Sequence, residues 1–446
     1  MALRTRLLPL TAVALIALCA SLAFGAPVSR TELPNGLTVV AAQEDSSAVA
    51  GVALVVKASA LDEQTYGIGT RAVLEQIILT QGQDALEGLR ELASANANRR
   101  SRYLVHTDYD LVEARISVEV DELVAGLAKL RAFVFAPDLS EEALEQAREF
   151  VQQGYDASHR SPVQTTYELF RTAFYGSGPL AGPMEGDHEA IAAVTLDQVR
   201  TLHREEYAAS NTVIGIVSPL AAEGAAAAVR DAFGDLPQAP APQPPALPAP
   251  PAQSEVEVGE SMDLGQASMV VGVPAAGPAE GDWLVGLVIN QLLDGPGGRI
   301  RRDRALLQAL GLVIPSQLLE AHYPIKPLAV PLTRQPYLAI HALCSPTTIE
   351  RTRRGLLRHL LALRSGSVAD AELQLAGRRV INSRVLERRW HGDAALQIAQ
   401  CEALGMPCYD DAEFAAAVAA ITREDLTAFA LRHFDRHAIG IQMPAL

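Results

Sequence analysis

Few residues of this chain stand at the spacings that catalysis or metal binding requires. His433 and His437 are four residues apart, so on a helix their imidazoles would share one face and one metal ion. No third ligand is evident beside them, and a solvated helix end is the simpler interpretation. The sequence contains no G-x-S-x-G, P-loop, C-x-x-C or G-x-G-x-x-G motif. The usual signatures of serine hydrolases and nucleotide-binding proteins are therefore absent.

A second candidate site lies on the helix expected over 67–82, GIGTRAVLEQIILTQG. Positions 72 and 76 lie one turn apart on this helix, but they hold Ala72 and Gln76, which are poor zinc ligands. Glu75 between them is either a surviving general base or an ordinary helix glutamate paired with Arg71, four residues earlier. Without a metal to acidify water, a lone carboxylate is a weak catalyst. We therefore interpret Glu75 as an ordinary helix residue.

Together with the preceding LPNGLTVVA (33–41), this helix resembles the start of the pitrilysin/insulinase family of zinc peptidases. That family carries the inverted motif H-x-x-E-H where this chain has residues 72–76. Its third zinc ligand, a glutamate on a later helix, corresponds here to Gln153 in EFVQQGYD. The resemblance implies a degenerate zinc site at Ala72, Gln76 and Gln153, with Glu75 as a vestige. We expect no catalytic residue, metal or cofactor in this chain, and zinc only in a partner chain.

The resemblance extends over the mature chain, through 173–199 to the closing ITREDLTAFALRHF. Non-catalytic subunits of the family hold substrate through an Arg and a Tyr in their second half. The matching region here implies substrate binding by Arg299 and Arg301, although a solvated basic helix start is the alternative. The tyrosine position is Ile314, which cannot donate a hydrogen bond.

The N-terminus predicts export. Residues 1–26 read as a signal peptide, with two arginines, an apolar run and a small-residue cleavage site, although an uncleaved anchor is the alternative. We expect a periplasmic protein with no integral membrane span after cleavage. The formal net charge of −15 argues against a nucleic-acid partner. Cys344, Cys401 and Cys408 remain after cleavage, and the sequence leaves open whether the last two form a disulfide.

A proline-rich segment divides the chain into two halves with similar orders of strands and helices. Eight prolines fall within 236–254, a composition that favours a semi-rigid linker. The predicted fold class is α+β: two homologous α/β sandwich domains, each a mixed sheet with helices packed on it. The predicted boundaries are 27–235 for the N-terminal domain, 236–255 for the linker and 256–446 for the C-terminal domain.

The leading functional hypothesis is a non-catalytic subunit. It would form a hetero-oligomer with a catalytic pitrilysin-like peptidase and close a chamber that admits peptides or unfolded polypeptide. The alternative is a stand-alone periplasmic peptide-binding or scaffold protein with no protease partner. A hydrolase that uses Glu75 in another way is a third reading, but no electrophile or nucleophile is evident near it.

Overall fold

The computed structural model describes residues 28–81, 106–240, 242–243, 245–246, 249, 251–253, 255–262, 265–294, 298–310, 325–330 and 336–445. The expected signal peptide and Ile314 lie outside these residues. Among the described helices, none has the length and apolar character needed to cross a membrane.

The first half of the chain forms a six-stranded sheet, the N-sheet, in the order β1-β2-β6-β3-β5-β4. Only β2 and β6 run parallel; the other neighbours are antiparallel. The strands are β1 (Ser29–Glu32), β2 (Thr38–Gln43), β3 (Val49–Val56), β4 (His106–Thr107), β5 (Val112–Glu119) and β6 (Thr212–Ser218). This is the mixed sheet expected from the apolar runs of the sequence.

The second half forms a five-stranded sheet, the C-sheet, in the order β7-β11-β8-β10-β9. Again one pair is parallel, β7 with β11, and the other neighbours are antiparallel. The strands are β7 (Glu255–Met262), β8 (Ala267–Pro274), β9 (Ile325–Val330), β10 (Tyr337–Cys344) and β11 (His437–Pro444). Strand order and directions match those of the N-sheet from β2 to β4, so the two halves repeat one topology.

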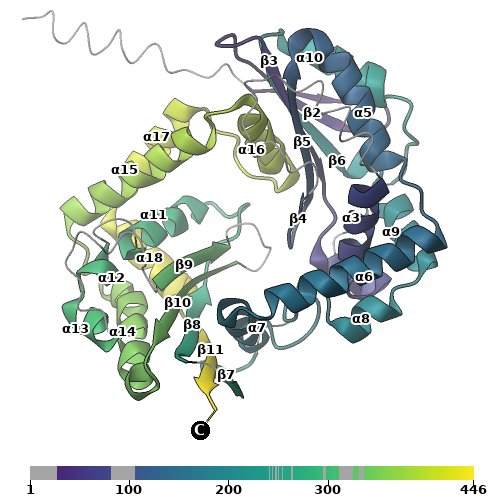
Figure 1. Ribbon diagram of the computed structural model, residues 1–446. Helices are drawn as coiled ribbons and strands as arrows, with labels where there is room; N and C mark the ends of the chain where they lie inside the picture. The colour runs from purple at the N-terminus through teal and green to yellow at the C-terminus, as the bar shows by residue number, and fades with distance from the viewer. Residues whose placement is uncertain are drawn as a thin grey trace, which may run out of the picture.

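The helices repeat in the same order (Figure 1). The first half contains α2 (Glu63–Tyr66), α3 (Thr70–Gln81), α5 (Leu123–Phe135), α6 (Glu141–Ser158), α7 (Pro162–Tyr175), α8 (His188–Ala193), α9 (Leu196–Glu206) and α10 (Ala222–Phe233). The second half contains α11 (Trp283–Asp294), α12 (Arg299–Arg302), α13 (Arg304–Ala309), α14 (Ile349–Leu361), α15 (Asp370–Glu387), α16 (His391–Ala403), α17 (Asp411–Ala419) and α18 (Arg423–His433). By chain order and sheet position, α3 corresponds to α11, α6 to α15 and α7 to α16.

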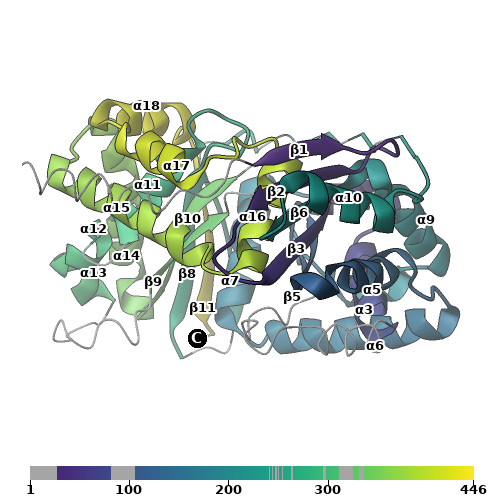
Figure 2. The same cartoon turned by 90° about the horizontal axis from the view of Figure 1, so that it is seen from above.

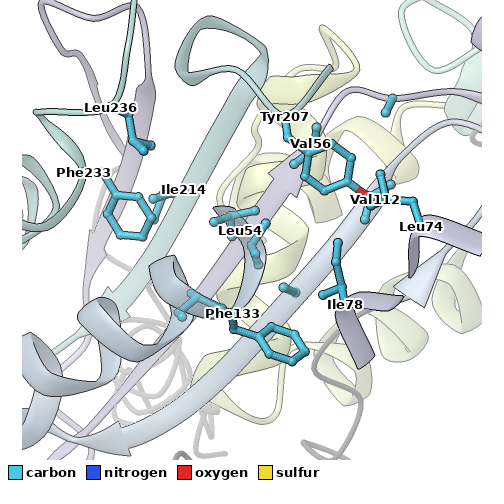
Figure 3. Packing of buried hydrophobic residues seen from close by; sticks show 14 of the residues in the cluster. Leu54, Val56, Leu74, Ile78, Val112, Phe133, Tyr207, Ile214, Phe233 and Leu236 are labelled. Carbon is cyan, nitrogen blue, oxygen red and sulfur yellow. The ribbon is translucent and has the colours of Figure 1, made fainter. Parts of the chain in front are cut away.

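Each sheet buries one face under helices of its own half. On the N-sheet, α3, α5, α9 and α10 cover a core that includes Leu54, Leu74, Phe133 and Phe233 (Figure 3). On the C-sheet, α11, α14 and α18 cover an equivalent core around Val288, Leu356 and Phe429. Burial of these side chains supplies most of the folding free energy of each unit.

The other face of each sheet is covered by a helix from the opposite half. Helix α16 packs on β3 and β6 of the N-sheet, and α7 packs on β8 and β11 of the C-sheet (Figure 2). Glycines allow this close approach. A Cβ at Gly215 would lie 2.1 Å from the carbonyl oxygen of Ala395, and one at Gly440 would lie 2.3 Å from the backbone nitrogen of Phe170. Each sheet is therefore covered partly by a helix of the other half. The sequence did not indicate this exchange of helices.

Candidate functional site

Helix α3 begins after a tight turn built on two glycines with positive φ, Gly67 and Gly69. Thr70 closes this turn by donating its hydroxyl to the carbonyl oxygen of Tyr66 at 3.0 Å. The helix then buries an apolar face, which includes Leu74 and Ile77, against the N-sheet. Apolar residues recur along α3 at the spacing of an amphipathic helix, so the motif positions lie next to this buried face.

The structure brings the two expected ligand-bearing helices together. Helices α3 and α6 lie side by side (Figure 1), and α6 begins where the sequence predicts, with the Ser140 hydroxyl accepting from the amide of Ala143. This contact is the one that a zinc site shared between the two helices would require.

The residues at the ligand positions do not fit zinc. Ala72 is half-buried and has no donor atom. Gln76 donates its amide to Thr80 at 2.9 Å, and Gln153, which is exposed, donates to Glu149 at 3.3 Å. Neutral amides engaged with their own helices are poor substitutes for imidazole and carboxylate. No group of potential metal ligands is found at this position among the described residues.

Arg71 does not form the expected ion pair with Glu75. Its side chain is fully buried and donates to the carbonyl oxygens of Ala58 at 2.8 Å and Asp108 at 2.6 Å. The expectation was wrong because the position of Arg71 on α3 points into the core, where loop carbonyls take the place of a surface partner. Glu75 is half-buried. Its negative charge contributes to the raised pKa of Tyr207, after desolvation of that phenol.

Two buried carboxyl groups lie near α3, and no sequence pattern predicted them. Glu63 accepts a hydrogen bond from the Arg71 amide at 3.0 Å, and burial raises its pKa to about 7 despite the Arg71 charge. Glu206 accepts from the Tyr66 hydroxyl at 2.9 Å and from Asn211 at 3.1 Å. Burial, with the Asp62 charge, raises the pKa of Glu206 to about 7. Their burial suits them to stabilising the loops around α3 rather than to contact with a substrate.

The predicted substrate-binding arginines lie in the other half, on the short helix α12. Arg299 is mostly buried and pairs with Glu372 of α15 at 2.9 Å, and it also donates to the Ser367 carbonyl. Arg302 binds the same carboxylate at 2.6 Å. Arg299 is therefore not a solvated helix start but part of an intramolecular ion-pair group. Arg301 is half-buried next to it. Substrate contact by either residue stays a prediction.

The two C-terminal histidines do not meet. His433 stands near Asp282 at 3.2 Å and Glu280, whereas His437 lies in β11 with Glu255 at 3.7 Å. They do not share one helix face, because α18 ends at His433 and the helical spacing does not continue. The preferred interpretation, a solvated helix end, was wrong, since the side chains of His433 and His437 are only 11% and 9% exposed. Asp282 is also paired with Arg432 at 2.7 Å, which offsets the charge that a cation would need.

A cavity of about 300 Å³ opens in the second half between α11, α15, α16 and α17. Side-chain amides line it, together with Trp283 and Phe414; the amides are those of Asn290, Gln291, Gln397 and Gln400. The buried Gln397 Oε1 has no hydrogen-bond partner. Since α11 and α15 correspond to α3 and α6, the cavity occupies the position in the C-terminal half that the degenerate zinc site occupies in the N-terminal half.

Comparison with known proteins agrees with this arrangement. Residues 193–377 match the family model described as the peptidase M16 inactive domain. An uncharacterized zinc protease of Mycobacterium leprae is 25% identical over 221 residues, which are 47% of this chain and 46% of the relative. One from Streptomyces coelicolor is 24% identical over 297 residues, 62% of this chain and 61% of the relative. The chain thus spans about half the length of the first of these relatives.

Solved structures share the fold over nearly the whole chain. A protease from Helicobacter pylori superposes with a TM-score of 0.79 at 15% identity, covering 94% of this chain and 100% of that chain. A peptidase M16 inactive domain from Pseudomonas fluorescens superposes with a TM-score of 0.78 at 19% identity, covering 94% and 98%. At these identities the superpositions establish the fold alone. The family model, the relatives and the shared two-sheet fold support the expected resemblance to an inactive member of the pitrilysin (M16) family.

Proposed function

We propose that this chain is the non-catalytic subunit of a pitrilysin-like peptidase. It pairs with a separate chain that carries an intact zinc motif and supplies part of the wall of a peptide-binding chamber, in the periplasm. The observation that carries the proposal is the preserved contact between α3 and α6 at a site without metal-binding side chains. The chain has the two-sheet fold, but its three ligand positions hold side chains that are poor zinc ligands.

The frame suits a role in binding rather than in chemistry. Two sandwiches of equal topology, each covered by a helix of the other, form an arc in Figure 1. A rigid wall orients a bound peptide without needing its own metal, because preorganised binding depends on shape and fixed donors. Zinc and the attacking water would both come from the partner chain.

The test is a gentle purification of the tagged full chain from the cells that produce it. Mass spectrometry would identify companions, and a fluorogenic peptide would report hydrolysis by each fraction. We expect a stoichiometric companion with the H-x-x-E-H motif, and chelator-sensitive peptidase activity only when both chains are present. The companion alone is the matched control.

Three results would contradict this proposal. A companion that is equally active alone would remove the need for a second subunit. A chain that elutes alone, metal-free and inert would favour a stand-alone peptide-binding or scaffold protein, for which the cavity between α11 and α15 offers a site. One tightly bound zinc ion per purified chain would overturn the non-catalytic assignment itself.

A further inference from the structure

Two cysteines at the end of α16 face each other. Cys401 lies in the last turn of the helix and Cys408 follows the loop after it, and the two free thiols are close enough to interact with each other. The loop is prepared for this approach. Gly405 adopts a positive φ of 67°, and the Met406 amide returns to the Cys401 carbonyl oxygen at 2.8 Å. The backbone therefore turns back toward the end of α16 before it reaches Cys408.

The pair is not equipped to be a metal site. Among the described residues the only group of metal-ligand side chains lies elsewhere, at Glu280, Asp282 and His433. Two thiols without a third or fourth ligand do not satisfy the tetrahedral geometry of zinc. The remaining chemistry of two adjacent thiols is oxidation to a disulfide.

The two thiols differ in reactivity. Cys401 is buried and lines the cavity between α11 and α15, whereas Cys408 is half-buried against the cluster around Ile398. The hydrogen bond from Cys401, together with the charges of Arg384 and Arg388, lowers the pKa of Cys408. Cys408 is therefore the thiolate that attacks first, and Cys401 is the resolving thiol.

We propose that Cys401 and Cys408 form a reversible disulfide that fixes the loop after α16 and, with it, the wall of the cavity. The oxidant is a small-molecule disulfide or the disulfide of a protein oxidant. The Cys408 thiolate attacks one of its sulfurs, and the other half leaves as a thiolate that takes up a proton. Cys401 then loses its proton to solvent and attacks Cys408 Sγ, which expels the second thiolate. The protein pair is oxidised by two electrons, and the oxidant is reduced to two thiols.

The bond would matter because of where α16 lies. This helix covers the N-sheet, although it belongs to the second half, and both Cys401 and Met406 line the cavity. Closing the short loop removes conformational freedom at the C-terminal end of the crossing helix. The oxidised form therefore has a firmer cavity wall and a firmer contact between the two halves. This inference is independent of the proposed partner chain.

The experiment compares the full chain after equilibration with oxidised or reduced glutathione. The protein is denatured, labelled with N-ethylmaleimide and analysed by intact and peptide mass. We expect the oxidised sample to lose two labels and to yield one peptide linked through Cys401 and Cys408. Cys344, fully buried in β10, supplies the matched control, because Cys344→Ser retains the paired loss. Cys408→Ser and Cys401→Ser each abolish it.

A second measurement tests the effect on the fold. We expect the Tm of the oxidised chain to exceed that of the reduced chain by about 2–6 °C, with slower hydrogen exchange over 404–408. Cys408→Ser is expected to show neither change. The inference is overturned if the folded chain keeps both labels in oxidised glutathione, if a glutathione adduct on Cys408 persists without closure, or if the linked form has the same Tm and exchange as the reduced form.

Discussion

The two halves of this chain repeat one topology but treat the same position differently. In the first half, α3 and α6 close on each other over buried polar groups, and the motif positions are filled by Ala72 and Gln76. In the second half, α11 and α15 leave a cavity of about 300 Å³ lined by amides and two aromatic rings. The frame is set by strand order and helix packing, whereas the side chains at the helix contact decide what the site can do. A chain can therefore share a fold with peptidases without having the side chains that their chemistry requires.

Helices α7 and α16 each cover the sheet of the other half, and the repeated topology alone does not predict this packing. Each helix fits on the foreign sheet because a strand glycine removes the side chain that would collide with it. The halves are therefore coupled through two equivalent contacts, and damage to either contact should reach both units.

Restoring the ligands would have the largest effect. In the triple variant Ala72→His/Gln76→His/Gln153→Glu, we expect about one zinc ion per chain with a Kd at or below about 1 μM, which corresponds to about 8 kcal/mol of binding free energy. The reason is that α3 and α6 still lie side by side. Metal analysis after gel filtration, with chelator competition, measures the gain. The double variant that keeps Gln153 should bind at least about tenfold more weakly. A folded triple variant with no more zinc than the natural chain would show that the spacing of the helices has changed.

The contacts of α7 and α16 with the sheet of the other half should give the next largest effect when they are changed. Gly440→Ala and Gly215→Ala should each lower the free energy of unfolding by about 3 kcal/mol, because the added Cβ meets backbone atoms of α7 or α16. Urea unfolding followed by circular dichroism measures the loss. Gly224→Ala on α10, where a Cβ would have no heavy atom within 4 Å, is the control and should raise stability by up to about 1 kcal/mol. Equal stability of all three variants would contradict the coupling of the halves.

Much of the fold could be predicted from the sequence, because its signals are local. Apolar runs over 48–58, 213–218, 266–274 and 335–345 are typical of buried strands, and they contain β3, β6, β8 and β10. Ser140, followed by two glutamates, is typical of a helix start, and α6 begins there. The packing of α7 and α16 on the sheet of the other half could not be predicted, because the apolar face of either helix could pack on any nearby sheet. Buried Glu63 and Glu206 were missed for a similar reason: each lies in a polar stretch, and only tertiary packing removes it from water. The three positions of the degenerate site came from the family resemblance, because no local signal in the sequence marks residues 72, 76 and 153 as neighbours.

The buried carboxyls Glu63 and Glu206 predict a pH dependence of stability in the first half. Glu63 has a folded pKa of about 7, above its ordinary value of 4.5, so the folded state takes up its proton more readily than the unfolded state does. Its favourable contribution is complete below about pH 4.5 and is lost as the pH rises through 7. We expect the free energy of unfolding to fall by up to about 3 kcal/mol over this range. Urea unfolding at several pH values should show a shallower slope for Glu63→Gln. An unchanged slope would mean that Glu63 is accessible to water.

Glu75 should give the smallest effect of all, and this null result is informative. The side chains at the neighbouring ligand positions are poor zinc ligands, and Arg71 donates to loop carbonyls rather than to Glu75. We expect Glu75→Gln to change the free energy of unfolding by less than about 0.5 kcal/mol and to leave the peptidase activity of the mixture with a partner unaltered. In the zinc-binding triple variant, where a general base would regain a water to act on, the same substitution should instead remove any hydrolysis that appears. A loss of activity on changing Glu75 alone, with zinc supplied only by the partner, would place this half of the chain inside the catalytic chemistry rather than beside it.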